Sequence, residues 1–233
     1  MVEDVINKVN KQHGLSFNPK THTYLLKNKK LNNVTTFLQK IFPFNQKEIS
    51  KAVAQKTGLT QQQILNQWKK QTRHGTNTHN LIQKHLQQNN LTKQETQKIT
   101  HAIKFFQENK KWQIKTVETK IFSKQHKLAG TVDLILKNKE NQKIYLADWK
   151  TSKKPIQKNK AYKKAKKPYH YLPNNKFHKF SMQLSLYQAI LKHQYNINIY
   201  DTFIIHLKRN QTYQIIDTTT LTYEANQILQ TLK

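Results

Sequence analysis

Three apolar segments near the middle of the chain, joined by short polar turns, constrain its fold more than any other feature. The segments cover residues 115–122, 128–136 and 143–150, and polar residues 123–127 and 137–142 separate them. Connections this short join antiparallel neighbours, because a parallel pair needs a crossover of a dozen or more residues. The sequence therefore predicts a three-stranded antiparallel meander.

Helical patterns flank this meander on both sides. Apolar spacing predicts helices over 47–70, 76–87 and 92–110, with Gly75 as an interruption after the first. The other expected elements are a hairpin over 14–36 leading into a helix that ends at Pro43, a helix over 181–194, strands over 201–208 and 212–216, and a terminal helix over 220–232. This order predicts a mixed α/β (α+β) fold, with a central mixed sheet flanked by helices.

The charge of the chain indicates its partner. Lysine and arginine number 41 against 12 acids, for a formal net charge of +29. A field of this sign attracts polyanions, and we expect the chain to bind nucleic acid. Only Arg73 and Arg209 are arginines. Because bidentate arginine contacts dominate base reading in the major groove, we expect contacts with the phosphate backbone instead.

Several classes of protein are excluded. The chain has no cysteine, so disulfides, thiolate zinc sites and iron–sulfur clusters are ruled out, and any metal must bind oxygen or imidazole.

No apolar run reaches the roughly 18 residues that span a bilayer. The start, residues 1–4, lacks the basic and apolar regions of a signal peptide. We expect a soluble intracellular protein that is not secreted and does not contact membranes. It would work in the cytoplasm or nucleoid, and its origin, cellular, viral or organellar, stays open.

The third segment ends in a pair of charged residues suited to catalysis. Alternate residues of a strand share a face, so Asp148 and Lys150 point the same way as apolar Ile144 and Leu146. The carboxylate can hold a divalent cation, and the ammonium can orient or polarise an attacking water. Taken alone, this pair also fits a solvated ion pair in a lysine-rich chain.

Two further acids lie in the neighbouring segments. Asp133 is flanked by apolar residues, and an isolated buried carboxylate is costly without a partner or a metal. Antiparallel pairing can bring it beside Asp148, where two carboxylates repel unless a cation lies between them. Glu118, in the first segment, is a candidate for a second metal. The alternative for both Asp133 and Glu118 is pairing with one of the many lysines.

Three polar residues on expected helices are further candidates. His79 lies one turn from Ile82, on the packed side of its helix, and the alternative reading is a hydrogen-bonded core histidine. Gln183 and Tyr187 are four residues apart on a later helix and share one face. Packing with one hydrogen bond between them would also explain that pair.

Together these residues resemble a known family. The motifs, in chain order, are Gly75-x-x-x-His79, Glu118, Gly130-x-x-Asp133, Asp148-x-Lys150-Thr151 and Gln183-x-x-x-Tyr187. This set, over residues 75–190, resembles the RecB-like branch of the PD-(D/E)XK nuclease superfamily. Residues 148–155 are similar to the same region of mitochondrial genome maintenance exonucleases and of related phage and viral exonucleases. Members of the branch with an iron–sulfur cluster ligate it through cysteine, which this chain lacks.

The resemblance implies a metal-dependent phosphodiester hydrolase acting in DNA repair, replication or recombination. Asp133, Asp148 and the backbone carbonyl of Trp149 would bind one or two Mg²⁺ or Mn²⁺ ions, and Lys150 would position the nucleophilic water. The family also implies a restriction-endonuclease-like core, which we assign to residues 71–233. Residues 1–70 would then be a hairpin and helical extension packed on that core.

The remaining motif residues take supporting roles in this reading. His79 would contact a metal or the substrate, and Glu118 would assist a second metal. Gln183 and Tyr187 would orient the lysine or the DNA backbone.

A basic segment over residues 151–179 is a candidate DNA-binding region, since it holds ten lysines and no acid. Basic groups with interleaved tyrosines suit a single strand, whose bases stack on the rings. The candidate residues are Lys153, Lys154, Tyr162, Lys163, Lys164, Lys166, Lys167, Tyr169 and Tyr171. The alternative is a mobile, solvated loop.

The function that we predict is a Mg²⁺- or Mn²⁺-dependent deoxyribonuclease, with exonuclease action on single strands or DNA ends favoured. One alternative is a structure-specific endonuclease or resolvase, which would need a dimer, whereas the sequence shows no dimer seam and we expect a monomer. A non-catalytic nucleic-acid-binding protein and a ribonuclease are the others. The sequence predicts neither cleavage polarity nor sequence preference.

Overall fold

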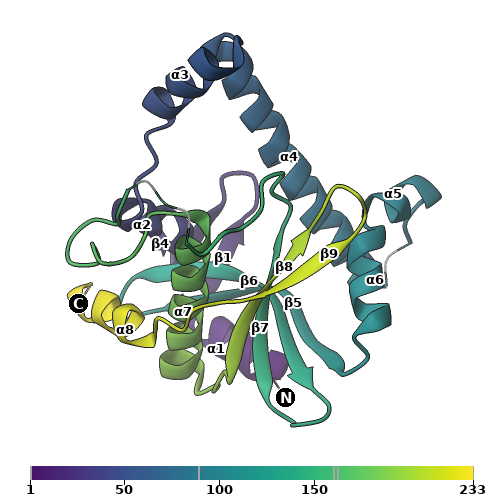
Figure 1. Ribbon diagram of the computed structural model, residues 1–233. Coiled ribbons are helices and arrows are strands. Elements are labelled where there is room, and N and C mark those ends of the chain that lie inside the picture. Colours follow the sequence, from purple (N-terminus) through teal and green to yellow (C-terminus); the bar gives the residue numbers. More distant parts are fainter. Residues whose placement is uncertain (1, 89, 160, 162, 233) are drawn as a thin grey trace.

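Figure 1 shows the computed structural model, which describes residues 2–88, 90–159, 161 and 163–232. A central mixed sheet has helices on both faces, so the predicted mixed α/β fold is confirmed. The helices are α1 (Val2–His13), α2 (Val34–Ile41), α3 (Gln46–Thr57), α4 (Gln61–Leu86), α5 (Lys93–Lys98), α6 (Thr100–Glu108), α7 (Lys176–Tyr195) and α8 (Thr222–Thr231). The strands are β1 (Leu15–Asn18), β2 (Thr23–Leu26), β3 (Lys29–Lys30), β4 (Asn32–Asn33), β5 (Trp112–Ser123), β6 (Leu128–Asn138), β7 (Ile144–Lys150), β8 (Asp201–Leu207) and β9 (Tyr213–Asp217).

The central sheet is built on the predicted meander. β5 pairs with β6 and β6 with β7, both antiparallel, which confirms that prediction. β8 pairs with β7 in parallel, β9 pairs with β8 antiparallel, and β4 extends the sheet at the start of β6. Because β7 and β8 run in the same direction, their carboxyl ends reach the same edge of the sheet, where Lys150 is the partner of His206.

The two faces of the sheet bury separate apolar clusters. Leu146 packs with α1, α2, α7 and α8 on one face, and Ala147 and Trp149 pack with α4 and α6 on the other. Figure 1 shows α7 lying across the sheet on the first face. The alternation along β7 is the predicted one, so Asp148 and Lys150 lie on the α7 side.

Helix α4 differs from the prediction, because it runs without a break through Gly75. A glycine inside a helix costs only about 1 kcal/mol relative to alanine, which the rest of a long helix can offset. Contact explains why the residue is small, since a Cβ at position 75 would lie 3.1 Å from Oγ1 of Thr151. Gly75 therefore marks the close approach of α4 to the end of β7.

Two other predicted helices were too long. The helix expected over 47–70 is divided, because α3 ends at Gly58 in the left-handed conformation and α4 then begins at the capping box of Thr60 and Gln63. The helix expected over 92–110 is divided at Ile99, whose φ of −119° is not helical. The proposed boundary between residues 70 and 71 falls within α4, and the division into an extension and a core stays a prediction.

No helix in the described ranges combines the length and the apolar character that crossing a bilayer requires.

Candidate metal-binding active site

Strand β7 ends in an acid and a lysine whose side chains meet. Nζ of Lys150 contacts Oδ2 of Asp148, which is 3% exposed. Burial raises the pKa of Asp148 to about 6; Lys150 opposes the rise and Asp133 adds to it. Burial alone would lower the pKa of Lys150, but the two aspartates outweigh it and raise that pKa above its usual value. Lys150 is therefore a fixed cation at neutral pH and holds its proton.

Asp133 lies beside Asp148, as the register of β6 against β7 requires. Its Oδ2 accepts a 2.9 Å hydrogen bond from the backbone N–H of Trp149. Burial raises the pKa of Asp133; His79 opposes the rise and Glu118 adds to it. Asp133 and Asp148, which are 15 residues apart in the sequence, therefore lie next to each other. The backbone N–H of Trp149 on the neighbouring strand holds the carboxylate of Asp133 in place.

His79 and Glu118 join Asp133 in a cluster of candidate metal ligands. Nδ1 of His79 lies 3.5 Å from Oε1 of Glu118 and 3.4 Å from Oδ2 of Asp133. One ligand atom from each residue lies within 4.8 Å of the other two. Two carboxylates and an imidazole fit Mn²⁺, and the carboxylates fit Mg²⁺. Asp148, predicted as a ligand, is not in this set and instead contacts Lys150.

The second nitrogen of His79 contacts another predicted ligand. Nε2 donates to the backbone carbonyl of Trp149 at 3.1 Å. The carbonyl expected to face a cation therefore has a histidine partner in this structure. This bond also fixes the orientation of the imidazole, because it leaves Nδ1 facing the two acids.

Glu118 reaches the cluster through an uncommon backbone conformation. Its φ of 51° lies in the left-handed region, where non-glycine residues are rare, and Nζ of Lys120 donates to its carbonyl at 2.6 Å. Such strain persists where surrounding contacts hold it, and it concentrates at functional sites. The carboxylate itself faces His79, whereas the lysine binds the main chain.

The charge on His79 gives a testable dependence of stability on pH in metal-free protein. Burial lowers the pKa of His79, but Asp133 and Glu118 outweigh it and raise the pKa to about 9. A histidine whose folded pKa exceeds its unfolded value stabilises fully below that unfolded value and loses the contribution as pH rises through 9. In EDTA, His79→Gln should lower the free energy of unfolding at pH 6.5 by roughly 2 kcal/mol, and the difference should shrink by pH 9.5.

Urea denaturation of both proteins at several pH values measures this difference. His74→Gln, at an exposed position of the same helix, is the matched control. A deficit for His79→Gln that stays constant from pH 6.5 to 9.5 would contradict the charged cluster.

Gln183 and Tyr187 make the contact predicted from their spacing. Nε2 of Gln183 donates to Oη of Tyr187 at 3.2 Å, and burial raises the pKa of the tyrosine well above its usual range. The tyrosine ring packs against Gly130, where a Cβ would lie 2.5 Å from Cε1 of the ring. A glycine at position 130 therefore allows α7 to bring its tyrosine onto β6, three residues before Asp133.

Two aromatic residues near the site did not emerge from the sequence. The ring of Phe180 lies 4.5 Å from Nζ of Lys150, and Oη of Tyr24 lies 2.7 Å from Oγ1 of Thr131. Phe180 could have been found, because it precedes Gln183 by three residues and shares its helix face. Tyr24 carries no such signal, because it lies in the predicted N-terminal hairpin, far in sequence from every motif of the site.

Part of the described portion of the basic segment over 151–179 packs on the core, unlike the solvated loop that was the alternative reading. Ile156, Ala165 and Leu172 are buried in the core on the α7 side, and residues 176–179 begin α7. The expectation that Tyr169 stacks on bases is wrong, because its ring is 5% exposed within that core. Tyr171 is exposed and donates to Glu224 at 2.8 Å. Tyr162 lies outside the described residues.

The lysines proposed for DNA binding in this segment are accessible. They are Lys153, Lys154, Lys163, Lys164, Lys166 and Lys167, all exposed.

Comparison with known proteins adds independent evidence. Residues 36–230 match the sequence model of the PD-(D/E)XK nuclease superfamily. No curated protein matches the chain. Among solved structures, the chain is similar to one described as the crystal structure of SSO0001, with 11% identity, coverage of 99% of this chain and 84% of that one, and a TM-score of 0.39.

Proposed function

Because the chain belongs to the PD-(D/E)XK nuclease superfamily, we propose that it is a Mg²⁺- or Mn²⁺-dependent nuclease that hydrolyses phosphodiester bonds in DNA. The observation that carries this proposal is the meeting of His79, Glu118 and Asp133 beside the contact between Asp148 and Lys150. These five side chains come from four separate elements, α4, β5, β6 and β7. A nuclease superfamily fold with this donor set fits metal-assisted hydrolysis better than nucleic-acid binding alone.

In this proposal, different residues of the chain bind the cation and position the reacting groups. His79, Glu118 and Asp133 would hold the cation, His79 through Nδ1 after that nitrogen loses its proton, with Asp148 and the carbonyl of Trp149 as further proposed ligands. A bound divalent cation generates hydroxide near neutral pH and offsets charge on the phosphoryl oxygens.

Lys150 is proposed to act through its positive charge, since the two neighbouring aspartates raise its pKa. Its ammonium orients the nucleophilic water and places positive charge beside the phosphoryl group, where negative charge grows in the transition state. Asp148 fixes the position of that ammonium. Gln183 and Tyr187 are proposed to orient the lysine or the DNA backbone.

The finer assignment rests on resemblance. The five ordered motifs support the RecB-like branch, and the residues after Asp148 support exonuclease action on single strands or ends. DNA is the proposed substrate, with RNA as the alternative, and the proposed working form is a monomer.

A cleavage assay tests the function. Single- and double-stranded DNA and RNA, labelled at either end, are incubated with Mg²⁺, Mn²⁺ or EDTA. We expect DNA cleavage with either metal and none in EDTA. A ladder that shortens progressively from one end supports an exonuclease, and discrete internal products favour the endonuclease. Binding without metal-dependent cleavage of any substrate would contradict the proposal.

A further inference from the structure

A polar groove of about 950 Å³ lies at the carboxyl edge of the sheet, next to the residues that follow Lys150. Four parts of the chain form its walls: α4, the α5–α6 region, the residues after β7 and the turn between β8 and β9. Figure 1 shows α4, α5 and α6 on the side of the sheet away from α7. The basic segment assigned from the sequence contributes only its first residues, so this groove is a different surface.

The groove has the chemistry of a polyanion site. Its cationic side chains are Lys70, Lys98, Lys153, Lys208 and Arg209. No acidic residue is among the described residues that line it. Arg209, one of the two arginines of the chain, is among them. Five glutamines lie between the cations and offer neutral N–H donors for phosphate oxygens.

The lining also indicates which part of a nucleic acid would fit. Its described residues include no phenylalanine, tyrosine or tryptophan, and its only rings are His74 and His101. Stacking of bases needs such aromatic platforms. Lysine and amide groups instead suit phosphates, which every nucleotide presents regardless of base.

The walls of the groove are joined directly to the catalytic strand. Nε2 of Gln71, which lines the groove, donates to the backbone carbonyl of Thr151 at 3.0 Å. On the other side, Nε2 of His206 donates to the carbonyl of Ser152 at 2.8 Å, and this histidine is 3% exposed. These bonds fix the chain immediately after Lys150 between α4 and β8. The groove is thereby tied to the end of the strand that carries Lys150.

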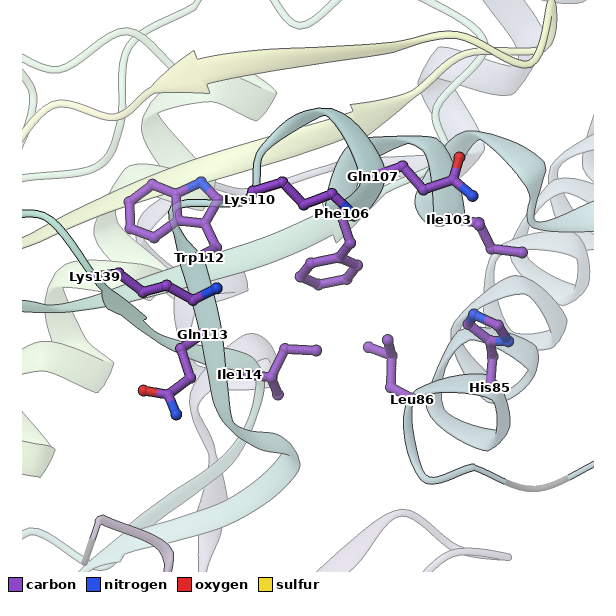
Figure 2. A pocket seen from close by; sticks show the side chains of 10 residues that line it. All are labelled: His85, Leu86, Ile103, Phe106, Gln107, Lys110, Trp112, Gln113, Ile114 and Lys139. Atoms are coloured by element: carbon purple, nitrogen blue, oxygen red, sulfur yellow. The ribbon is translucent and has the colours of Figure 1, made fainter.

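A second pocket, of about 630 Å³ at the opposite end of the strands, differs in character. Figure 2 shows Leu86, Phe106 and Ile114 directed into the same hollow, with Lys110 and Lys139 also lining it. Its apolar floor does not suit a polyanion. Its lysines therefore provide a control for removing charge at a distance from the catalytic strand.

We propose that this groove, which Thr151 and Lys153 line just after β7, binds the sugar–phosphate backbone of the nucleic-acid strand next to the cleavage site, through phosphate contacts and without reading bases. This inference rests on the proposed nuclease function. It adds a binding surface for the nucleic-acid strand outside the metal cluster. Lys98, Lys208 and Arg209 are the residues chosen for the test. They line the groove but lie outside the basic segment predicted from the sequence, so their loss leaves that segment unchanged.

The test compares two variants that each lose three positive charges. One is Lys98→Gln/Lys208→Gln/Arg209→Gln. The control is Lys110→Gln/Lys111→Gln/Lys139→Gln, which removes the two lysines of the second pocket and the exposed Lys111 beside Lys110. Fluorescence anisotropy with a labelled 30-nucleotide single-stranded DNA, in EDTA at several salt concentrations, measures binding without cleavage. The groove variant should bind at least about tenfold more weakly than the control, with a salt slope lower by about 2.

The same sequence made as RNA should show a similar loss, because both strands present phosphates. Equal binding by the two variants, or a loss confined to one kind of strand, would overturn the inference. Binding is measured without metal, so this result is independent of cleavage. If the wild type cleaves DNA while the variants bind equally, the groove assignment alone fails; if the wild type does not cleave, the nuclease proposal fails on its own.

Discussion

Lys150→Ala is expected to lower phosphodiester cleavage on the order of a thousandfold while leaving nucleic-acid binding within about threefold of the wild type. The reason is the fixed charge of Lys150, whose pKa is raised by the two aspartates beside it. A cation acting on the transition state contributes more to the rate than to binding, since the ground-state phosphate is already surrounded by many lysines. Single-turnover cleavage and anisotropy binding, run on the same preparation, separate the two effects.

Two further variants distinguish a loss of catalysis from a loss of folding and from the loss of any lysine. Truncating the lysine leaves Asp148 buried without its cation, which destabilises the fold. Lys150→Gln keeps a hydrogen-bond donor for the carboxylate and should be equally inactive, with circular dichroism used to confirm that it is folded. Lys139→Ala, in an exposed turn, should cleave like the wild type. Cleavage by Lys150→Ala within tenfold of the wild type would remove the lysine from the mechanism.

The second large effect is expected at Asp133. Asp133→Asn should weaken Mn²⁺ binding by at least about a hundredfold and lower cleavage by a similar factor at a metal concentration that saturates the wild type. Asparagine retains an oxygen that can accept the N–H of Trp149, so the strand pairing survives while the charge that attracts the cation is lost. Isothermal titration with Mn²⁺ measures the affinity.

The control for this experiment is another acid of the same chain. Glu140→Gln, in the exposed turn between β6 and β7, removes the same charge away from the cluster and should leave Mn²⁺ affinity unchanged. Equal Mn²⁺ binding by Asp133→Asn and the wild type would mean that the three-residue cluster does not hold the cation.

The meander and the meeting of its acids followed from local rules. Turns of five or six residues allow only antiparallel neighbours, and a repeat of two residues fixes which side chains share a face. Once β6 and β7 are paired, the register brings Asp133 next to Asp148. The helix face shared by Gln183 and Tyr187 followed in the same way from a spacing of four.

Features that depend on distant contacts could not be predicted. The sequence predicts a break at Gly75, because the partner of this residue, Thr151, comes close only in the folded chain. The sequence predicts an exposed Tyr169 because lysines surround it, whereas the residue packs in the core. The groove is the clearest case, since Lys98 and Arg209 are 111 positions apart and line the same groove only after α7 carries the chain back to form β8. The periodicity of apolar residues predicts which side chains share a face of a helix or strand. It does not predict which of these faces pack together in the folded chain.

The unbroken course of α4 through Gly75 lets one rigid helix support the end of β7 on both sides of Lys150. Gln71, Gly75 and His79 follow one another at a spacing of four, so they lie along one side of the helix. Gln71 donates to the carbonyl of Thr151 and His79 to that of Trp149, and Gly75 lets the helix approach Thr151 between these contacts. The main chain before and after the lysine is thereby tied to a single helix, and a bend in α4 would move the lysine and His79 relative to each other.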